Sequence, residues 1–181
     1  MKLTSSIQKN TELLKKSLSS DDVTFTEFSA CGKKAVLVFV NDITDVKSAG
    51  ELILKPLSES KEKFGEKFVK NNIPAPQKKT VTTAEEAIKE VVSGNTLLVA
   101  EGTPKAFSFG LKKFEKRAIS EPPTSTVLKG PREGFVESLP VNVSMMRRRL
   151  KTPALKFINL TVGKYSQTPV SICYVKGIAK D

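Results

Sequence analysis

The stretch VTFTEFSACGKKAVLVFV, residues 23–40, decides the fold of the N-terminal part of the chain. Its first eight residues alternate and are rich in β-branched and aromatic side chains, which is typical of a half-buried strand. AVLVFV at 35–40 is a continuous apolar run, which is typical of a central strand buried on both faces. Cys31-Gly32-Lys33 suits a turn between them, so the stretch predicts a β-hairpin.

Helices are expected on both sides of this hairpin. A partial apolar stripe predicts a short amphipathic surface helix over 4–18. A helical region follows at roughly 45–70, and we expect an interruption near Lys55-Pro56 because proline disrupts a helix interior. Thr83-Ala-Glu-Glu86 matches a capping box that opens a helix, and Gly94 suits the left-handed position after its end.

Two more strands complete this part of the chain. TLLVAEG at 96–102 has the pattern of a buried strand, and KAFSFG returns as a second strand after a turn. Residues 20–115 therefore predict the order β–β–α–α–β–β, a mixed α/β layer with at least four strands.

A second pattern begins after residue 137. Ser138 can cap a helix that runs to about residue 151, and Thr152-Pro153 ends it. The helix carries a narrow apolar stripe, which consists of Leu139, Val143, Met146 and Leu150. Residues 155–163 and 168–179 then predict two alternating strands around a turn.

The segment between these two patterns reads as a linker. SEPPTSTVLKGPREG at 120–134 holds three Pro and two Gly, which exclude a helix. We therefore expect an α/β (α+β) fold with two small subdomains, mixed sheets and flanking helices. The first subdomain covers 1–119, a Pro/Gly-rich linker loop covers 120–136, and 137–181 forms the start of a second subdomain.

Charge is concentrated toward the C-terminus. The chain has a net charge of +11, and residues 121–181 hold ten Lys/Arg against four Asp/Glu. A basic region of this kind suits nucleic acid, anionic lipid or an acidic protein partner, and it equally suits a solvated surface.

The chain contains no His, which argues against an enzyme. Ser–His and Cys–His nucleophile pairs, His metal sites and imidazole acid–base catalysis are all excluded. Cys31 and Cys173 lie in or next to apolar stretches and are expected to be buried free thiols. The carboxylate pairs Asp21-Asp22 and Glu85-Glu86 read as capping and solvation. We therefore expect no catalytic residue, metal or cofactor.

Targeting signals are not expected either. MKLTSSIQKNTELLKK lacks the apolar core of a signal peptide, and no stretch approaches the ~20 apolar residues that span a bilayer. As a sequence, the chain reads as soluble and cytosolic.

Three consecutive arginines close the helix at 139–151. By helical phase, Arg147 and Arg149 flank the apolar stripe and Arg148 points away from it, so we expect stems over the core edge and heads in water. Cations are favoured in a last helical turn, whereas phosphate prefers the N-terminus. A solvated or protein-facing role is favoured over a phosphate pocket.

The loop before that helix carries opposite charges between two glycines. Gly130 and Gly134 allow positive φ and Pro131 stiffens the loop, so that Arg132 and Glu133 project from it. Two interpretations stay open for this loop: a structural turn, or a recognition loop for a zwitterion or a partner subunit. The residues alone favour the turn.

These motifs resemble a known family. EPPTSTVLKGPREGFVESLPVNVSMMRRRLKTPALKF is similar to the signature stretch of the A subunits of bacterial spore germinant receptors, the GerA family. GNTLLVAEGTPKAFSF and FINLTVGKYSQTPVSICYVKGIA resemble its flanking strand pairs. The chain departs at Ser125 and Lys129, where Glu and Arg are usual, and at Pro140, where a basic residue is usual.

The resemblance implies a function that composition does not show. Such receptors sense nutrients such as amino acids or sugars, and their A subunits act in the spore inner membrane with B and C subunits and other A subunits. The N-terminal domain is implied to lie on the cytosolic side, without catalysis. Family members continue into membrane-spanning helices, so the chain is expected to be truncated before that region.

Three hypotheses stay open from the sequence. The leading one is a sensing and assembly module in which Gly130, Arg132, Glu133 and Gly134, with the three arginines, contact ligand or partners. The alternative is a basic nucleic-acid or anionic-surface binder, although no nucleic acid is implied by the resemblance. The third is a small-ligand site in a cleft between the subdomains.

Overall fold

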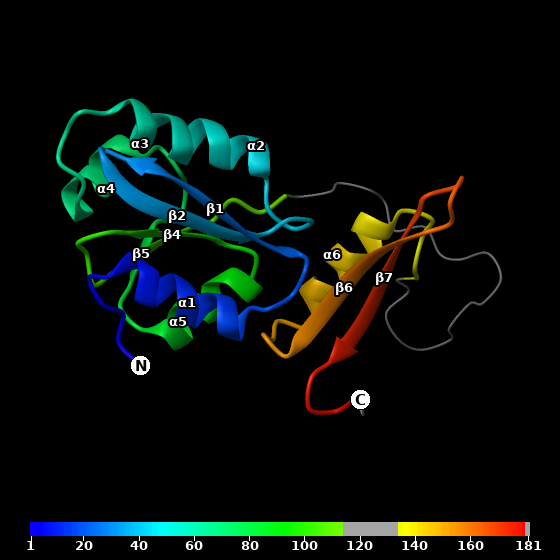
Figure 1. The fold of residues 1–181 in the computed structure, drawn as a ribbon. Coiled ribbons are helices and arrows are strands. Elements are labelled where there is room, and N and C mark those ends of the chain that lie inside the picture. The colour runs from blue at the N-terminus through cyan, green and yellow to red at the C-terminus, as the bar shows by residue number, and fades with distance from the viewer. Residues whose placement is uncertain (114–133, 180–181) are drawn as a thin grey trace, which may run out of the picture.

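The hairpin at residues 23–40 forms as expected and supplies two strands of a five-stranded antiparallel sheet (Figure 1). The computed structural model describes residues 1–113 and 134–179, and its sheet has the strand order β1-β2-β4-β5-β3. The strands are β1 (Val23–Ala30), β2 (Lys33–Val40), β3 (Lys79–Val81), β4 (Thr96–Ala100) and β5 (Ala106–Phe109). The sequence predicted all of these except β3, which adds a short edge by pairing with β5.

Helices cover both faces of this sheet, as Figure 1 shows. Side chains alternate along β2, so that Leu37 and Phe39 belong to one core and Val36 and Val38 to the other. The first core is covered by α2 (Val46–Ala49), η1 (Gly50–Leu54), α3 (Lys55–Glu59) and α4 (Glu66–Asn72), and the second by α1 (Ile7–Ser17) and α5 (Ala84–Val92). A sheet buried on both faces explains the continuous apolar run of β2, although its strand pairs are antiparallel.

The interruption expected near Lys55-Pro56 occurs as a change of helix type and not as a break in the chain of helical residues. A π-helical turn, η1, precedes Pro56, which then lies in the first turn of α3. The wider turn leaves room for the proline ring, and a missing N–H is tolerated at a helix start. The chain instead leaves the helix at Ser60, whose backbone is extended, and α4 begins after Gly65.

The residues at both ends of α5 act as the sequence predicts. Thr83 is the N-cap, and its side-chain oxygen accepts a hydrogen bond from the Glu86 N–H at 3.3 Å. Gly94 follows the helix with φ of +87°, and its N–H donates to the Val91 carbonyl at 2.9 Å.

Residues 134–179 form a separate small layer, which we call the α6–hairpin unit, and residues 1–113 are the sheet unit. Helix α6 (Leu139–Arg149) has Pro140 in its first turn, and its N-cap Ser138 makes no side-chain capping bond. Strands β6 (Leu155–Val162) and β7 (Thr168–Val175) pair antiparallel. Val143, Leu155 and Phe157 form a small core between α6 and the hairpin. The α+β class is thus confirmed, whereas the division of the chain at 120–136 stays a prediction because most of that segment lies outside the described residues.

The expectation of buried thiols is wrong for Cys173. Both cysteines are free, but Cys31 is only half-buried and Cys173 is exposed on β7. Cys173 pairs with the buried Phe157, but it lies on β7, the outer strand of a two-stranded hairpin, whereas the buried side chains Leu155 and Phe157 belong to β6.

Gly94→Ala tests the close approach at the end of α5. A Cβ at Gly94 would lie 2.9 Å from Ile43 Cδ1 at a positive φ, so we expect a loss of about 1–2 kcal/mol in the free energy of unfolding. The control is Gly50→Ala, where φ is −61° and a Cβ meets nothing within 4 Å. This control should gain about 0.5–1 kcal/mol. Equal effects of the two substitutions in urea unfolding would contradict this account.

Candidate functional site

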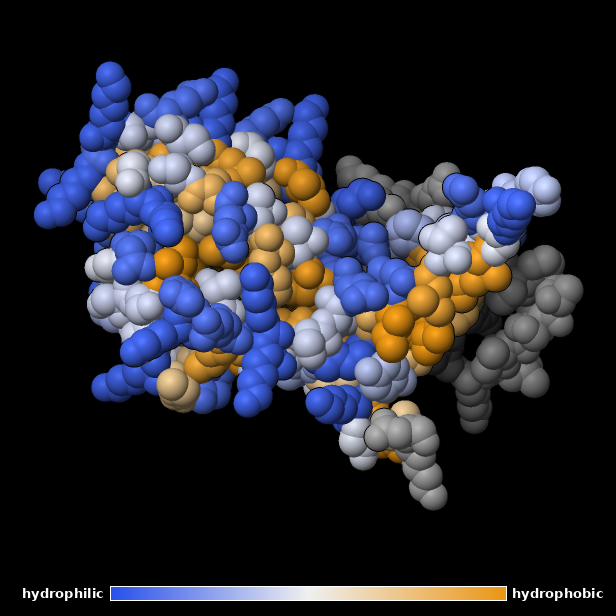
Figure 2. Space-filling view, in the orientation of Figure 1, coloured by the Kyte–Doolittle hydropathy of each residue, from blue (hydrophilic) through white to orange (hydrophobic). Residues whose placement is uncertain are grey.

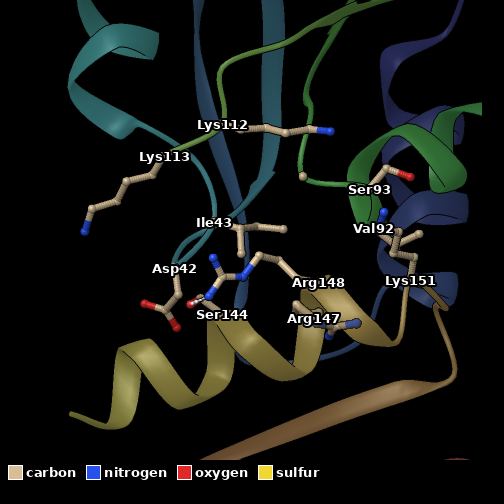
Figure 3. Close-up of a pocket in the computed structure, with 11 residues that line it drawn as sticks. Asp42, Ile43, Val92, Ser93, Lys112, Lys113, Ser144, Arg147, Arg148 and Lys151 are labelled. Atoms are coloured by element: carbon tan, nitrogen blue, oxygen red, sulfur yellow. Dashed lines mark hydrogen bonds between the residues drawn. The ribbon is translucent and has the colours of Figure 1, made fainter. Parts of the chain in front are cut away.

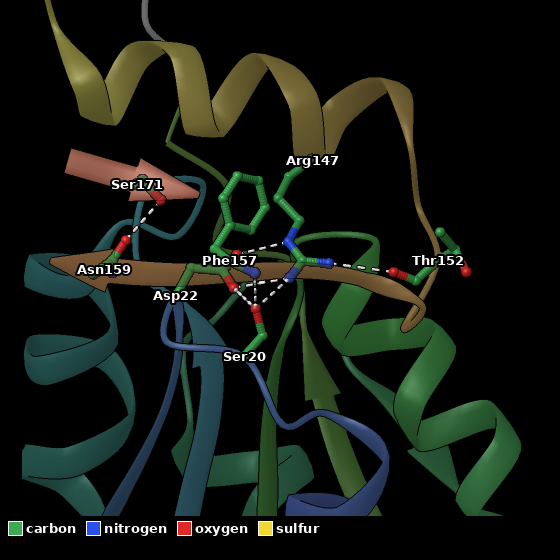
Figure 4. A network of polar contacts seen from close by, with 7 residues as sticks. All are labelled: Ser20, Asp22, Arg147, Thr152, Phe157, Asn159 and Ser171. Atoms are coloured by element: carbon green, nitrogen blue, oxygen red, sulfur yellow. Dashed lines mark hydrogen bonds and ion pairs between the residues drawn. The ribbon is translucent and has the colours of Figure 1, made fainter. Parts of the chain in front are cut away.

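A buried ion pair joins the last turn of α6 to the sheet unit (Figure 4). Arg147 Nε lies 2.6 Å from Asp22 Oδ2, and Nη2 lies 2.8 Å from Oδ1. Arg147 is 1% exposed and Asp22 is 3% exposed. Two parallel N–H···O bonds fix both the distance and the orientation of the two groups, so the pair places α6 against the start of β1.

Two of the three remaining N–H groups of Arg147 are also bonded. Nη2 donates to Ser20 Oγ at 3.2 Å, and Nη1 donates to the Thr152 carbonyl at 3.2 Å. The guanidinium carbon lies 5.1 Å from the centre of the Phe157 ring. Taking two charges out of water is costly unless hydrogen bonds replace the lost hydration, and this site supplies them.

The connection between α1 and β1 carries four consecutive residues that bond to the α6–hairpin unit. We call Ser19-Ser20-Asp21-Asp22 the SSDD anchor. Ser19 Oγ accepts from Lys156 Nζ at 3.3 Å, and Ser20 Oγ accepts from the Phe157 N–H at 2.8 Å. Asp21 accepts from the Asn159 N–H at 2.8 Å, and its own N–H donates to the Phe157 carbonyl at 3.0 Å. The anchor therefore forms hydrogen bonds with backbone groups of β6 from both its own backbone and its side chains.

Lys156 extends this joint to the end of α1. Its side chain is 5% exposed, and Nζ donates to the Ser17 carbonyl at 3.2 Å. Burial of the ammonium lowers the pKa of Lys156, and the nearby charges of Arg147 and Lys176 lower it further. The cluster is thus tightly packed and electrostatically coupled.

A cavity of about 280 Å³ lies beside the joint (Figure 3). Both units line it, with Ile43 and Val92 from the sheet unit and Ser144 and Arg148 from α6. Arg148 Nη2 lies 3.5 Å from Ser144 Oγ, at the long limit of a hydrogen bond.

The three arginines have different environments. The expectation that Arg147 keeps its head in water is wrong, because α6 is buried on a second side where Ser144 and Arg147 face the sheet unit. Arg148 and Arg149 are exposed, as expected for the solvated side. Leu150, the last member of the apolar stripe, is exposed as well, because the helix ends at Arg149.

The loop residues predicted to contact a ligand or partner are mostly outside the description. Gly130, Arg132 and Glu133 lie outside the described residues, and Gly134 is half-buried at the start of the α6–hairpin unit. Their predicted binding roles stay predictions.

Asp22 is the residue of this joint that sequence reasoning missed. The pair Asp21-Asp22 was expected to cap or solvate, but both carboxylates bond to the α6–hairpin unit instead. The only signal was its chemistry: a double carboxylate just before a strand can meet a cation from elsewhere, and nothing in the spacing names Arg147.

Comparison with known proteins places this chain in a family. The model of the Bacillus/Clostridium GerA spore germination proteins matches residues 10–181. Spore germination protein B1 of Bacillus subtilis (strain 168) is 28% identical over 187 residues, across 100% of this chain and 39% of that protein. Stage V sporulation protein AF of the same organism is 32% identical over 165 residues, across 89% of this chain and 34% of that protein. The chain thus spans little more than a third of these relatives.

A solved structure has the same fold. The N-terminal domain of the A subunit of the Bacillus megaterium spore germinant receptor GerK3 superposes with a TM-score of 0.76 at 19% identity. The match covers 100% of this chain and 69% of that one.

The chain is a member of a spore germination family and belongs to the GerA proteins. More narrowly, its fold is that of the N-terminal domain of a germinant receptor A subunit. The family is non-enzymatic, which confirms the expectation from the missing histidine. None of the helices described in residues 1–113 and 134–179 is long and apolar enough to cross a membrane.

A double-mutant cycle measures the coupling of the buried pair. Arg147→Met and Asp22→Ala should each cost about 3–5 kcal/mol in urea unfolding, because each leaves the other charge buried and unpaired. The double variant should cost at least about 2 kcal/mol less than the sum of the two, because it leaves no lone charge.

Arg148→Met is the matched control, one residue along the same helix. Its side chain is exposed, so the change should stay within about 0.5 kcal/mol. Strictly additive effects of Arg147→Met and Asp22→Ala would show that the pair does not couple the two units.

Lysine NMR titration tests the electrostatics of the same cluster. The Lys156 pKa should lie below that of the exposed lysines because its ammonium is buried. Arg147→Met should raise the Lys156 pKa, since it removes a repulsive charge and leaves Asp22 to attract the ammonium. A Lys156 pKa that does not move in this variant would contradict the coupling.

Proposed function

We propose that the chain is the cytosolic-side, N-terminal part of a nutrient germinant receptor A subunit at the spore inner membrane, acting in germinant sensing, signal transduction and receptor assembly. The observation that carries this proposal is the SSDD anchor with Arg147, because it fastens two folded units through a buried ion pair and the hydrogen bonds around it. The family match and the fold of the GerK3 domain support it.

Such a joint suits transmission of a signal. Buried pairs with fixed geometry do not stretch gradually, so a displacement of one unit either moves the other or breaks the contact. A nutrient or a partner subunit that favours one placement of α6 would therefore act on the sheet unit as well. The partners we propose are the B and C subunits and other A subunits, and the nutrient is an amino acid or a sugar.

The hairpin supports a second part of the proposal, that residues 137–181 begin a second α/β subdomain. One face of β6 and β7 carries five apolar side chains, each at least 39% exposed: Ile158, Leu160, Val162, Val170 and Ile172. Figure 2 shows them as an apolar band on the α6–hairpin unit. Contiguous apolar patches mark contact surfaces. We propose that chain beyond residue 181 covers this one, as the greater length of the relatives allows.

Germination assays test the role of the joint. In a full-length receptor, Arg147→Lys keeps the positive charge but cannot make the bidentate contact. We expect spores of this variant to hold normal amounts of the A subunit and to germinate several-fold more slowly when nutrients are supplied. The measurement is loss of optical density, with the A subunit quantified by immunoblot of spore membranes.

Lys61→Arg is the control for this assay, because it exchanges one cation for another at an exposed position of the α3–α4 connection, away from the joint and the cavity. It should behave as the unmodified receptor does. Arg147→Lys spores with normal subunit levels and unchanged germination at every nutrient concentration would refute a transducing role for the joint.

Leu160→Ser tests what covers the hairpin. In the 181-residue chain Leu160 is 45% exposed, so the free energy of unfolding should change by less than about 0.5 kcal/mol. In a chain extended to the full length of the domain, the same change should cost about 1.5–3 kcal/mol, because a buried leucine is lost. Tyr165→Ser, in the exposed turn, should be neutral in both chains. A neutral Leu160→Ser in the extended chain would rule out this covering.

A further inference from the structure

The cavity beside the joint is lined by several cations that the pair with Asp22 does not use. Lys112 comes from the sheet unit, Arg148 from the last turn of α6, and Lys151 from just beyond it (Figure 3). Within the described residues, neither Lys112 nor Lys151 makes an ion pair or a side-chain hydrogen bond, and Arg148 has only the long contact to Ser144. Asp42 is the one acidic residue in the described lining.

The C-termini of two helices lie at the cavity and explain some of the cations that line it, but not all of them. Helices α5 and α6 both end there, at Val92 and Arg149. Each C-terminus acts as roughly half a negative charge, which attracts cations and weakens with salt. Two such ends amount to about one charge. Together with Asp42 they leave the described lining positive, because Arg147 is already neutralised by Asp22 while Lys112, Arg148 and Lys151 bring three positive charges.

We propose that this cavity binds a compact, multivalent oxyanion, of phosphate or pyrophosphate chemistry. Its volume of about 280 Å³ suits a small molecule. Cations on opposite walls favour a ligand with at least two charges, since a monovalent ion engages one wall and competes with bulk salt. No aromatic side chain lines the described part of the cavity, so it lacks the stacking platform that nucleic-acid bases use.

Binding there would join the two units a second time. Lys112 and Arg148 belong to different units, so an anion between them favours the arrangement in which α6 stays against the sheet unit. This consequence rests on the proposed function, in which the placement of α6 carries the signal. The anion binding itself does not.

Calorimetric titration of the 181-residue chain with pyrophosphate, at constant ionic strength set with NaCl, tests the proposal. We expect saturable one-to-one binding, with amide shifts confined to residues around 42–43, 92–94, 112 and 144–151. Lys112→Gln with Lys151→Gln should weaken binding by at least about tenfold, because two of the facing charges are gone. The matched control removes two exposed lysines from the α3–α4 connection, Lys61→Gln with Lys63→Gln. It should change binding less than about twofold.

Three results would overturn the proposal. They are absence of saturation by pyrophosphate, equal weakening by the two double variants, and binding to vesicles of anionic phospholipid in the same salt without binding of free pyrophosphate. The last would assign the cations to a membrane surface. None of them affects the germination test of Arg147→Lys, which needs no added anion, so failure here and failure of the transducing role can be told apart.

Discussion

The contact between Arg147 and Asp22 is the constraint on which the placement of the α6–hairpin unit depends. Replacing a buried ion pair by apolar groups is often neutral for stability, so its presence is better explained by geometry than by energy. A bidentate contact tolerates one distance and one orientation, whereas an apolar contact tolerates sliding. The neighbouring bonds of Ser20 and Asp21 to β6 fix the same register from the backbone side. The joint thus specifies where the two units sit.

The sheet unit provides a rigid base for that joint. Its central strands are buried on both faces, and neighbouring strands join through short antiparallel pairs. The anchor immediately precedes the start of β1, the edge strand that pairs with the buried strand β2. A displacement at Asp22 is therefore passed through β1 toward the buried central strands, because close-packed interiors transmit strain.

Sequence patterns predicted the helices and strands that follow from the spacing of neighbouring residues. They missed the side-chain contacts that join residues far apart in the sequence. The β1–β2 hairpin, the α5 cap at Thr83 and the strands β6 and β7 each follow from neighbouring residues. The role of Asp22 could not be predicted, because its partner is 125 residues away. The prediction for α6 assumed that only its apolar stripe is buried. Arg147 is buried because a second side of the helix packs against the sheet unit. At Pro56 a π-turn absorbed a break that the proline rule predicts. The GPREG loop was identified by resemblance, and its geometry lies largely outside the described residues.

The wide separation of the joined residues has a consequence for biosynthesis. Every strand of the sheet unit lies before residue 110, so that unit can assemble while the C-terminal part is still being made. Until α6 emerges, the Asp22 carboxylate remains hydrated at the surface of an already folded layer. The docking of Arg147 is then a late step that joins residues far apart in the sequence. Such a step closes a long loop, which costs conformational entropy of the chain. A nascent chain stalled before α6 would therefore expose the Asp22 carboxylate, which the finished protein buries.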